Sequence, residues 1–230
     1  MSDFPELEKK LKTKFKNKDL LTQAFVHRSY LNENPNFHLS QNERLEFLGD
    51  AVLELVITEN LYNTYPDKAE GELTSWRAAL VNAKMLSAVA KKLEFNDFLL
   101  LSRGEKKETG KAREYILANT MESFIGALYL DQGLKAVGKF IIKHILSELP
   151  RVLESNLYQD AKSHFQEIAQ EKTGITPAYS VLKEWGPDHA KHFQIGVYLN
   201  KELVAEGQGS SKQEAEQDAA TNGLEIKSWK

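Results

Sequence analysis

The stretch Asn-Glu-Arg-Leu-Glu-Phe-Leu-Gly-Asp-Ala-Val-Leu, residues 42–53, decides the fold of the first half of the chain. Leu45, Leu48 and Val52 recur at three- and four-residue spacing, which is typical of a helix with one apolar side. We expect this helix to cover residues 42–64 and to contact a core through those side chains.

Three carboxylates lie on the other side of that helix. At about 100° per residue, Glu46 and Asp50 fall within about 60° of Glu43, so the three share one narrow stripe. Carboxylates held this close repel each other unless a cation lies among them, and Mg²⁺ prefers such oxygen ligands. A purely structural interpretation is also open, because Ser40 and Glu43 match a helix capping box and acids are favoured in a first helical turn.

Two further residues of this helix favour a functional surface. Gly49 costs about 1 kcal/mol relative to alanine inside a helix, which indicates the close approach of another backbone or of a ligand. Phe47 lies off the apolar side, and an exposed aromatic there indicates a partner surface, although a single exposed phenylalanine is common.

A second helical segment, residues 114–131, has similar features. Asn119 and Glu122 lie one turn apart on one face, and Gly126 interrupts the helix. Two helices with interior glycines can pack closely, so we expect this pair to bring Glu122 towards the acidic stripe.

Residues 1–148 contain no strand-like alternation and are expected to be almost entirely helical. The expected helices are 5–14, 18–30, 42–64, 73–93, 113–131 and 134–147. The polar segment 103–112 holds two glycines and is expected to be a mobile loop.

The second half changes character. We expect helix 160–173, strands 178–183, 193–199 and 201–208, and an alanine-rich helix 211–226. The chain therefore divides into an all-α domain at 1–149, a linker at 150–158 that starts with Pro150, and a small α+β domain at 159–228. In the α+β domain a helix, a three-strand sheet and a second helix follow each other.

Composition narrows the class of protein. The chain has no cysteine, which excludes disulfides and thiolate sites and suits a reducing cytoplasm. It has no run of 18 or more apolar residues, so no membrane span is expected. The net charge is −3, and residues 157–230 hold 8 Lys and 11 acidic residues, so the basic footprint of a nucleic-acid-binding protein is missing. Any nucleic acid must therefore be bound by local clusters of basic side chains.

Several segments resemble the ribonuclease III family. NERLEFLGDAVL at 42–53 matches the family's signature almost residue for residue, and HRSY at 27–30, EGELT at 70–74 and ILANTMESFIGALYLDQG at 116–133 follow in the expected order. The tail from residue 164 to residue 220 is similar to a double-stranded RNA-binding domain. The resemblance covers nearly the whole chain and has the simple bacterial layout of one nuclease domain and one binding domain.

This resemblance implies an Mg²⁺-dependent endoribonuclease, in which Mn²⁺ can substitute. Such an enzyme hydrolyses double-stranded RNA to 5′-phosphate and 3′-hydroxyl ends and processes structured precursors such as rRNA and mRNA. The implied catalytic residues are Asp50, Glu122 and Glu43. The implied metal ligands are Glu46, Asp50, Asn119 and Glu122. Glu70 matches a further acidic position near the RNA, or is an ordinary loop acid.

Asn119 departs from the family pattern, which commonly has Asp at this position. An amide oxygen can ligate or orient, but it brings no negative charge, so metal affinity should fall. A catalytically impaired double-stranded RNA-binding protein is therefore the alternative function. The four acids Glu43, Glu46, Asp50 and Glu122 argue against it.

The resemblance also implies partners. The resemblance implies a homodimer with two acidic sites facing one cleft, which fits Phe47 as an interface residue. It also implies a substrate that is RNA rather than a small molecule. We expect the protein to be cytoplasmic, as the lack of cysteine suggests. Double-stranded RNA is recognised by shape, through 2′-hydroxyl and phosphate contacts. The expected contacts in the tail are Gln166, Glu167, Pro187, Asp188, His189, Ser211, Lys212 and Gln213. Gln213 and Gln217 stand where related domains often carry lysines, so we expect weak RNA binding by this domain alone.

Overall fold

A computed structural model describes residues 4–155, 161–187 and 191–229. The chain forms two compact units, Met1–Tyr158 and Gln159–Lys230.

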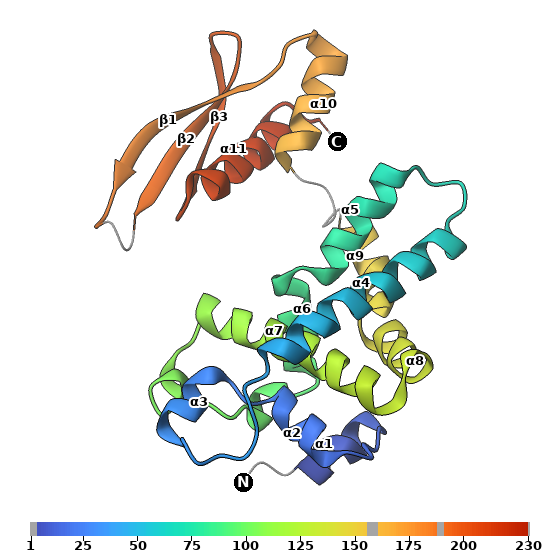
Figure 1. The fold of residues 1–230 in the computed structure, drawn as a ribbon. Coiled ribbons are helices and arrows are strands. Elements are labelled where there is room, and N and C mark those ends of the chain that lie inside the picture. Colours follow the sequence, from blue (N-terminus) through green and yellow to red (C-terminus); the bar gives the residue numbers. More distant parts are fainter. Residues whose placement is uncertain (1–3, 156–160, 188–190, 230) are drawn as a thin grey trace. The chain divides into compact units, whose positions relative to one another are not determined.

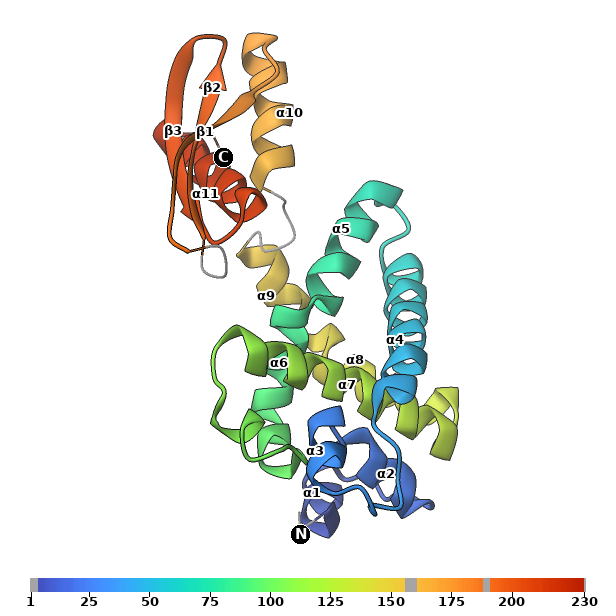
Figure 2. The same ribbon diagram turned by 60° about the vertical axis from the view of Figure 1, so that its left-hand side comes forward.

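The first unit is built from helices around a long crossed pair, α4 (Glu43–Thr64) and α7 (Lys111–Gln132) (Figure 1). The others are α1 (Phe4–Leu11), α2 (Lys18–Ala24), α3 (Arg28–Glu33), α5 (Glu70–Val81), α6 (Ala83–Lys92), α8 (Leu134–His144) and α9 (Leu149–Glu154). Short 3₁₀ turns lie at Phe95–Phe98, Glu105–Lys107 and Leu146–Glu148. Figure 2 shows α4 and α5 running side by side in opposite directions.

The core of this unit is aromatic at its centre. Phe25 lies between α2 and α3, and its ring packs at 5.1 Å from that of Phe95 and at 6.3 Å from that of Phe124 on α7. All three side chains are fully buried. Such tilted and edge-on aromatic pairs add to the free energy gained from burial. They fix the N-terminal helices against the middle of α7, where the acidic residues lie.

Two predicted helices are each divided in the structure. The helix expected at 18–30 is interrupted because Phe25 accepts a backbone hydrogen bond from Leu100 and His27 donates one to it, and a helix leaves no backbone groups free for such bonds. The helix expected at 73–93 breaks at Asn82, whose backbone is extended and whose side chain caps α6 by accepting from the N–H of Met85.

Two segments expected to be irregular contain helical structure. In 103–112, Arg113 donates to the carbonyl oxygens of Glu105 and Glu108 and so ties the 3₁₀ turn to the start of α7. The expected linker at 150–158 begins as helix α9, in which Val152 is fully buried and Arg151 donates to Glu148 at 2.8 Å.

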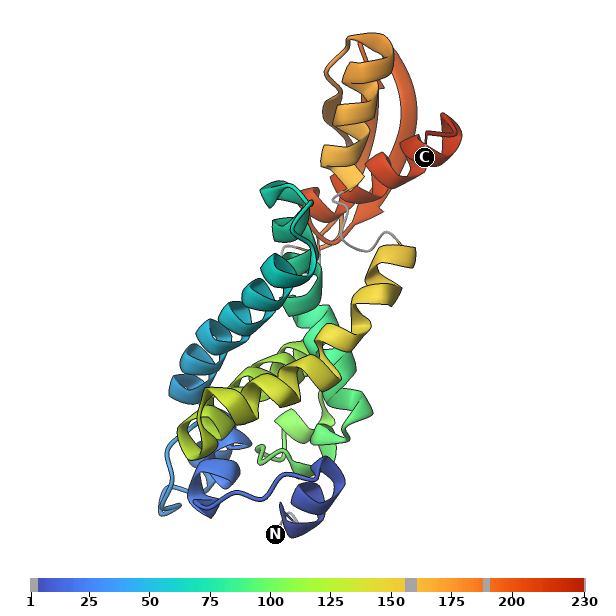
Figure 3. The same ribbon diagram turned by 90° about the vertical axis from the view of Figure 1, so that its right-hand side faces the viewer.

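The second unit confirms the predicted α+β class. Helix α10 (Ala161–Thr173) is followed by strands β1 (Ala178–Trp185), β2 (His192–Leu199) and β3 (Glu202–Gly209) and by helix α11 (Lys212–Ile226). The sheet is antiparallel with the order β1-β2-β3, and both helices lie on one face of it (Figure 3). The buried core between the layers contains Phe165, Val197 and Ala219.

Of the residues that the structure describes, none belongs to a helix long and apolar enough to span a membrane.

Candidate active site

The site is built where α4 and α7 cross, and two glycines permit the crossing. A Cβ placed on Gly49 would lie 1.7 Å from the carbonyl oxygen of Glu122, and one on Gly126 would lie 2.2 Å from the carbonyl oxygen of Leu45. No side chain fits at such distances. The close helix packing expected from the interior glycines is therefore present, and it brings Glu122 to the acidic stripe of α4.

A buried polar cluster fixes the start of α4. Asn42 is 4% exposed, and its amide donates to the carbonyl oxygen of Ala24 at 3.2 Å and to Ser123 Oγ at 3.4 Å. Ser123, also buried, donates to the same carbonyl oxygen at 2.6 Å. This arrangement corrects the capping-box interpretation, because Asn42 precedes the first residue of α4 and no side-chain cap bond forms there. Glu43 is thus free of a capping role at the start of this helix.

Glu46, Asp50 and Glu122 form one electrostatic cluster. Burial raises the pKa of Glu122 to about 8, and the negative charges of Asp50 and Glu46 add to the effect. Partial burial also raises the pKa of Glu46, with contributions from Glu43 and Asp50. Among the described residues no cation pairs with these three carboxylates, so the cluster is an energetically unfavourable arrangement that a bound cation would stabilise.

Asn119 lies beside this cluster on α7, one turn before Glu122. Its side chain is within hydrogen-bonding reach of Glu46 and opposes the rise in the pKa of that carboxyl group. An aspartate at the same position would instead add a fourth negative charge. The amide therefore lowers the electrostatic strain of the metal-free site.

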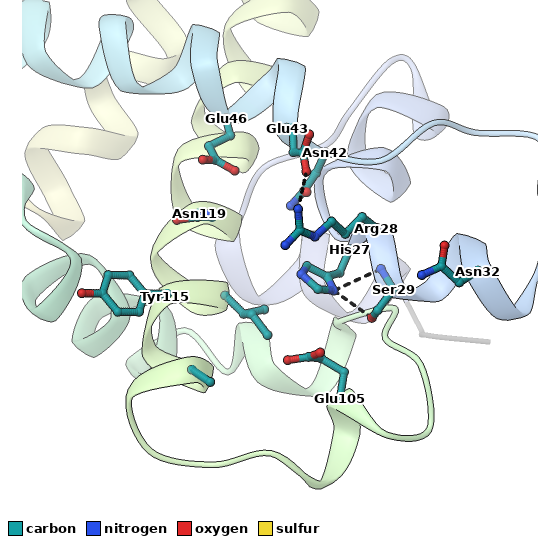
Figure 4. Close-up of a pocket in the computed structure, with 12 residues that line it drawn as sticks. His27, Arg28, Ser29, Asn32, Asn42, Glu43, Glu46, Glu105, Tyr115 and Asn119 are labelled. Atoms are coloured by element: carbon teal, nitrogen blue, oxygen red, sulfur yellow. Dashed lines mark hydrogen bonds and ion pairs between the residues drawn. The ribbon is translucent and has the colours of Figure 1, made fainter. Parts of the chain in front are cut away.

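A pocket of about 520 Å³ opens beside the cluster and is lined by residues of α3, α4 and α7 (Figure 4). Glu43 and Glu46 lie on its α4 side, and Asn119 and Tyr115 on its α7 side. Glu43 is exposed, accepts a hydrogen bond from Gln41 at 2.8 Å and lies 3.9 Å from the guanidinium of Arg28.

His27 also lines this pocket, although we assigned it no function from the sequence. Its Nδ1 accepts from the backbone N–H of Ser29 and lies 2.8 Å from Ser29 Oγ. Partial burial lowers the pKa of His27. Figure 4 shows the ring between Arg28 and Glu105. The HRSY match at 27–30 was the signal that could have placed His27 and Arg28 at the site.

The donor set fits a divalent metal ion that keeps part of its water shell. Among the described residues, no group of three His, Cys, Asp or Glu side chains is arranged to hold an ion by itself. Mg²⁺ is typically bound by one or two carboxylates together with water and substrate phosphates, rather than by a complete protein cage. Carboxylate and amide oxygens next to an open pocket match that requirement.

Four residues predicted in the first unit do not line the pocket. Asp50 and Glu122 belong to the acidic cluster beside it, whereas Glu70 and Phe47 belong to neither. Glu70 begins α5 beyond the far end of α4 and lines a separate pocket of about 640 Å³, where it accepts from Thr74 Oγ1 at 3.0 Å. The rise of about 1.5 Å per residue separates Asp50 from Thr64 by about 21 Å along the helix axis. Phe47 is 82% exposed, and Leu55 and Tyr62 on the same face of α4 are also exposed.

The predicted RNA contacts of the second unit are mostly exposed. Gln166 and Glu167 lie on the outer side of α10, and Pro187 follows β1. Asp188 and His189 lie outside the described residues. Ser211 caps α11 by accepting from the N–H of Glu214 at 3.1 Å, and Gln213 is exposed in its first turn.

Lys212 is already engaged in the second unit. Its ammonium lies 3.6 Å from Glu184 and 5.7 Å from the centre of the Phe193 ring. Gln217, which stands where a lysine was expected, accepts from the backbone N–H of Lys162 and so joins α11 to the start of α10. Both residues have structural partners that RNA would have to replace or share.

An all-helical unit with this acidic crossing, followed by a double-stranded RNA-binding fold, defines an endoribonuclease for double-stranded RNA. The sequence model described as Ribonuclease-III-like matches residues 17–149, and that described as Double-stranded RNA binding motif matches residues 161–227. The chain belongs to the ribonuclease III family.

Relatives and solved structures agree with this assignment. Ribonuclease 3 of Streptococcus mutans is 45% identical over 226 residues, covering 95% of this chain and 96% of the relative. Ribonuclease 3 of Syntrophomonas wolfei is 46% identical and covers 92% of this chain and 89% of the relative. A structure of the nuclease domain of the Campylobacter jejuni enzyme, 38% identical, matches 64% of this chain and 99% of its own with a TM-score of 0.58.

Proposed function

We propose that this chain hydrolyses phosphodiester bonds in double-stranded RNA with the help of Mg²⁺, and that the products carry 5′-phosphate and 3′-hydroxyl ends. The observation that carries the proposal is the crossing of α4 and α7 at Gly49 and Gly126, since it gathers Glu46, Asp50 and Glu122 with no compensating cation from the part of the chain that the structure describes. Mn²⁺ should substitute, because it accepts the same oxygen donors.

Each residue of the cluster has a proposed role. Glu46, Asp50, Glu122 and Asn119 would hold the metal ion. A bound divalent ion supplies a water molecule of lowered pKa and stabilises negative charge on the leaving oxygen. Glu43, exposed at the edge of the pocket, would orient water. Arg28 lies 3.9 Å from Glu43 and would pair with a phosphate of the strand.

We also propose a homodimer in which the exposed face of α4 is buried. Phe47, Leu55 and Tyr62 are 82%, 55% and 72% exposed, which is costly for an apolar stripe along a single helix. The nuclease domain of the Campylobacter jejuni enzyme has a structurally flexible region that is involved in dimer formation. A two-fold dimer would let each of two sites cut one strand, and it offers a position for Glu70 near the partner's RNA.

The second unit would hold the duplex by its shape through α10, the turn after β1 and the start of α11. Structured precursors such as rRNA and mRNA in the cytoplasm are the proposed substrates.

The proposal is tested by a gel assay on end-labelled duplex RNA in Mg²⁺, Mn²⁺ or EDTA. The chain should cut only with metal, and Glu122→Gln should abolish cutting while RNA binding persists. Asn119→Asp should raise cleavage at low Mg²⁺. Cutting in EDTA, or unchanged cutting by Glu122→Gln, would show that the acidic cluster is not the active site.

One observation favours a second candidate, a double-stranded RNA-binding protein with impaired catalysis. Asn119 contributes a neutral amide that hydrogen-bonds to Glu46, at a position where a further carboxylate would strengthen metal binding. Binding without cutting in either metal, with cutting restored by Asn119→Asp, would identify this alternative.

A further inference from the structure

A basic concave surface lies on the first unit, between the end of α1 and helix α8. It encloses about 510 Å³ and shares no lining residue with the acidic pocket. Its lysines are Lys12, Lys14, Lys135, Lys139 and Lys143. This concentration of positive charge is unexpected in a chain whose net charge is −3.

No carboxylate lines this surface, and within the described parts of the chain none of its five lysines forms an ion pair. Asp131, at the end of α7, is engaged elsewhere, accepting from the backbone N–H groups of Lys16 at 2.9 Å and Asn17 at 2.8 Å. Partial burial acts to raise the pKa of Asp131, but these hydrogen bonds outweigh it and lower the pKa. The positive charges are therefore left without a matching protein group.

The lysines of α8 form a regular row. Lys135, Lys139 and Lys143 follow each other at intervals of four residues, so they lie on one side of the helix about 6 Å apart along its axis. Phe140, 5% exposed, lies at the base of the surface and packs against the ring of His144 at 4.8 Å. Partial burial lowers the pKa of His144, so the positive charge at neutral pH comes from the lysines.

Lys12 occupies a strained backbone position. Its φ of 54° lies in the left-handed region, at the end of α1, where the next N–H bonds back to the carbonyl oxygen of Glu8. Glycine or asparagine is usual at such a position, and another residue costs about 1 kcal/mol. A lysine here strains the fold while adding charge to the surface.

We propose that this surface binds phosphate groups of the RNA backbone, on a segment beyond the one held at the acidic cluster. Lysine is a compact point charge that attracts phosphates without recognising the base sequence. A row of such charges matches the repeated phosphates of an RNA strand better than it matches one small anion. The inference rests on the proposed function, because it takes RNA as the ligand.

The test compares two RNAs in EDTA, a short duplex limited to the cut stem and a longer RNA with an added helical arm. Lys135→Glu/Lys139→Glu should weaken binding of the longer RNA about tenfold relative to the short one. The slope of log affinity against log salt should fall by about one for each lost phosphate contact. Lys84→Glu is the control, since Lys84 is an exposed lysine on α6 outside this surface.

Lys12→Gly separates binding from folding. Glycine relieves the left-handed backbone, so the variant should melt at the same or a higher temperature and still lose affinity for the longer RNA. Equal affinity of all variants and wild type for the longer RNA, or an equal loss for both RNAs, would overturn the inference. If the wild type neither binds nor cuts the short duplex in Mg²⁺, it is the proposed function that fails.

Two competitors distinguish other ligands. Suppose that wild type binds poly-L-glutamate, that Lys135→Glu/Lys139→Glu loses this binding, and that the RNA affinity of the variant is unchanged. The surface then fits an acidic protein segment, and the RNA assignment is wrong. If inorganic pyrophosphate binds with the same loss and RNA does not, the ligand is a free phosphate compound. Loss of RNA affinity alone, or together with pyrophosphate, supports the backbone assignment.

Discussion

At the scale of single residues, the burial of Glu122 and the hydrogen bond between Asn119 and Glu46 set the electrostatics of the acidic cluster. The helical spacing of Glu43, Glu46 and Asp50 could be derived from the sequence, because i and i+3 or i+4 positions share a face. The burial of Glu122 and the contact between Asn119 and Glu46 depend on a helix far away in the chain. His27 was missed because its place depends on hydrogen bonds with the segment around Leu100.

The raised pKa of Glu122 predicts a pH-dependent stability of the metal-free protein. Its pKa rises from 4.5 to about 8 in the folded state, so between these values the folded state binds more protons than the unfolded state. The free energy of unfolding should therefore fall as pH rises from about 4.5 to about 8. Because solvent screens a partly exposed group, we expect the free energy of unfolding to fall by about 2 kcal/mol over this pH range.

Glu122→Gln should remove that fall, so the variant should be more stable than wild type at pH 9 and similar or less stable at pH 4. Urea unfolding in EDTA at pH 4, 6, 7 and 9 measures the difference. Parallel stability curves for the two proteins would contradict the assigned environment of Glu122.

Asn119→Asp should strengthen metal binding by about tenfold, because a fourth carboxylate adds negative charge at the site. It should also destabilise the metal-free protein, since Glu46 loses its hydrogen-bond partner and gains a like charge. Titration calorimetry with Mg²⁺ and with Mn²⁺ measures the affinity. Unchanged affinity would exclude Asn119 from the metal site.

At the scale of elements, most helices were predictable from apolar spacing, and the bounds of α4 at Glu43–Thr64 agree with the expected 42–64. The breaks at Phe25–His27 and at Asn82 were not predictable in this way. The first break depends on backbone hydrogen bonds to a distant segment. The second depends on Asn82, which caps α6 although the apolar spacing continues across it without interruption. Glycine inside two helices was the most informative local signal, since it predicted the crossing.

Gly126→Ala should separate α4 from α7. The added Cβ would lie 2.2 Å from the carbonyl oxygen of Leu45, so the backbones must move apart, at a cost of about 2 kcal/mol or more, and cleavage should be lost. Gly138→Ala on α8 is the matched control, because nothing lies within 4 Å of its Cβ position. The control should stabilise the protein by about 0.5–1 kcal/mol, as measured by thermal unfolding. Equal stability changes in both variants would disprove the role of the crossing.

At the scale of the whole molecule, the two-unit organisation was visible as a change from helical spacing to alternation, and the boundary falls between Tyr158 and Gln159. The basic surface on α8 was not visible, because its lysines are distributed between two segments that only the fold brings together.

Phe47→Glu should convert the proposed dimer into monomers, because a charge would replace the most exposed apolar side chain of α4. Analytical ultracentrifugation at micromolar concentration measures the mass. Ile226→Glu, a change at a side chain that is 65% exposed on α11, is the control and should leave the mass unchanged. A wild-type monomer, or a dimer that survives the change at Phe47, would rule out this face as the interface.

The crossing of α4 and α7 has a consequence for how the protein is made. Asp50 and Glu122 stand far apart in the sequence, so the ribosome releases the first acids of the site long before the last one. Contacts between distant segments form late in folding, because the intervening chain must first be closed into a loop. A nascent chain that ends before α7 therefore lacks part of the proposed site, and we expect it to cut RNA only after this helix has been synthesised and has docked.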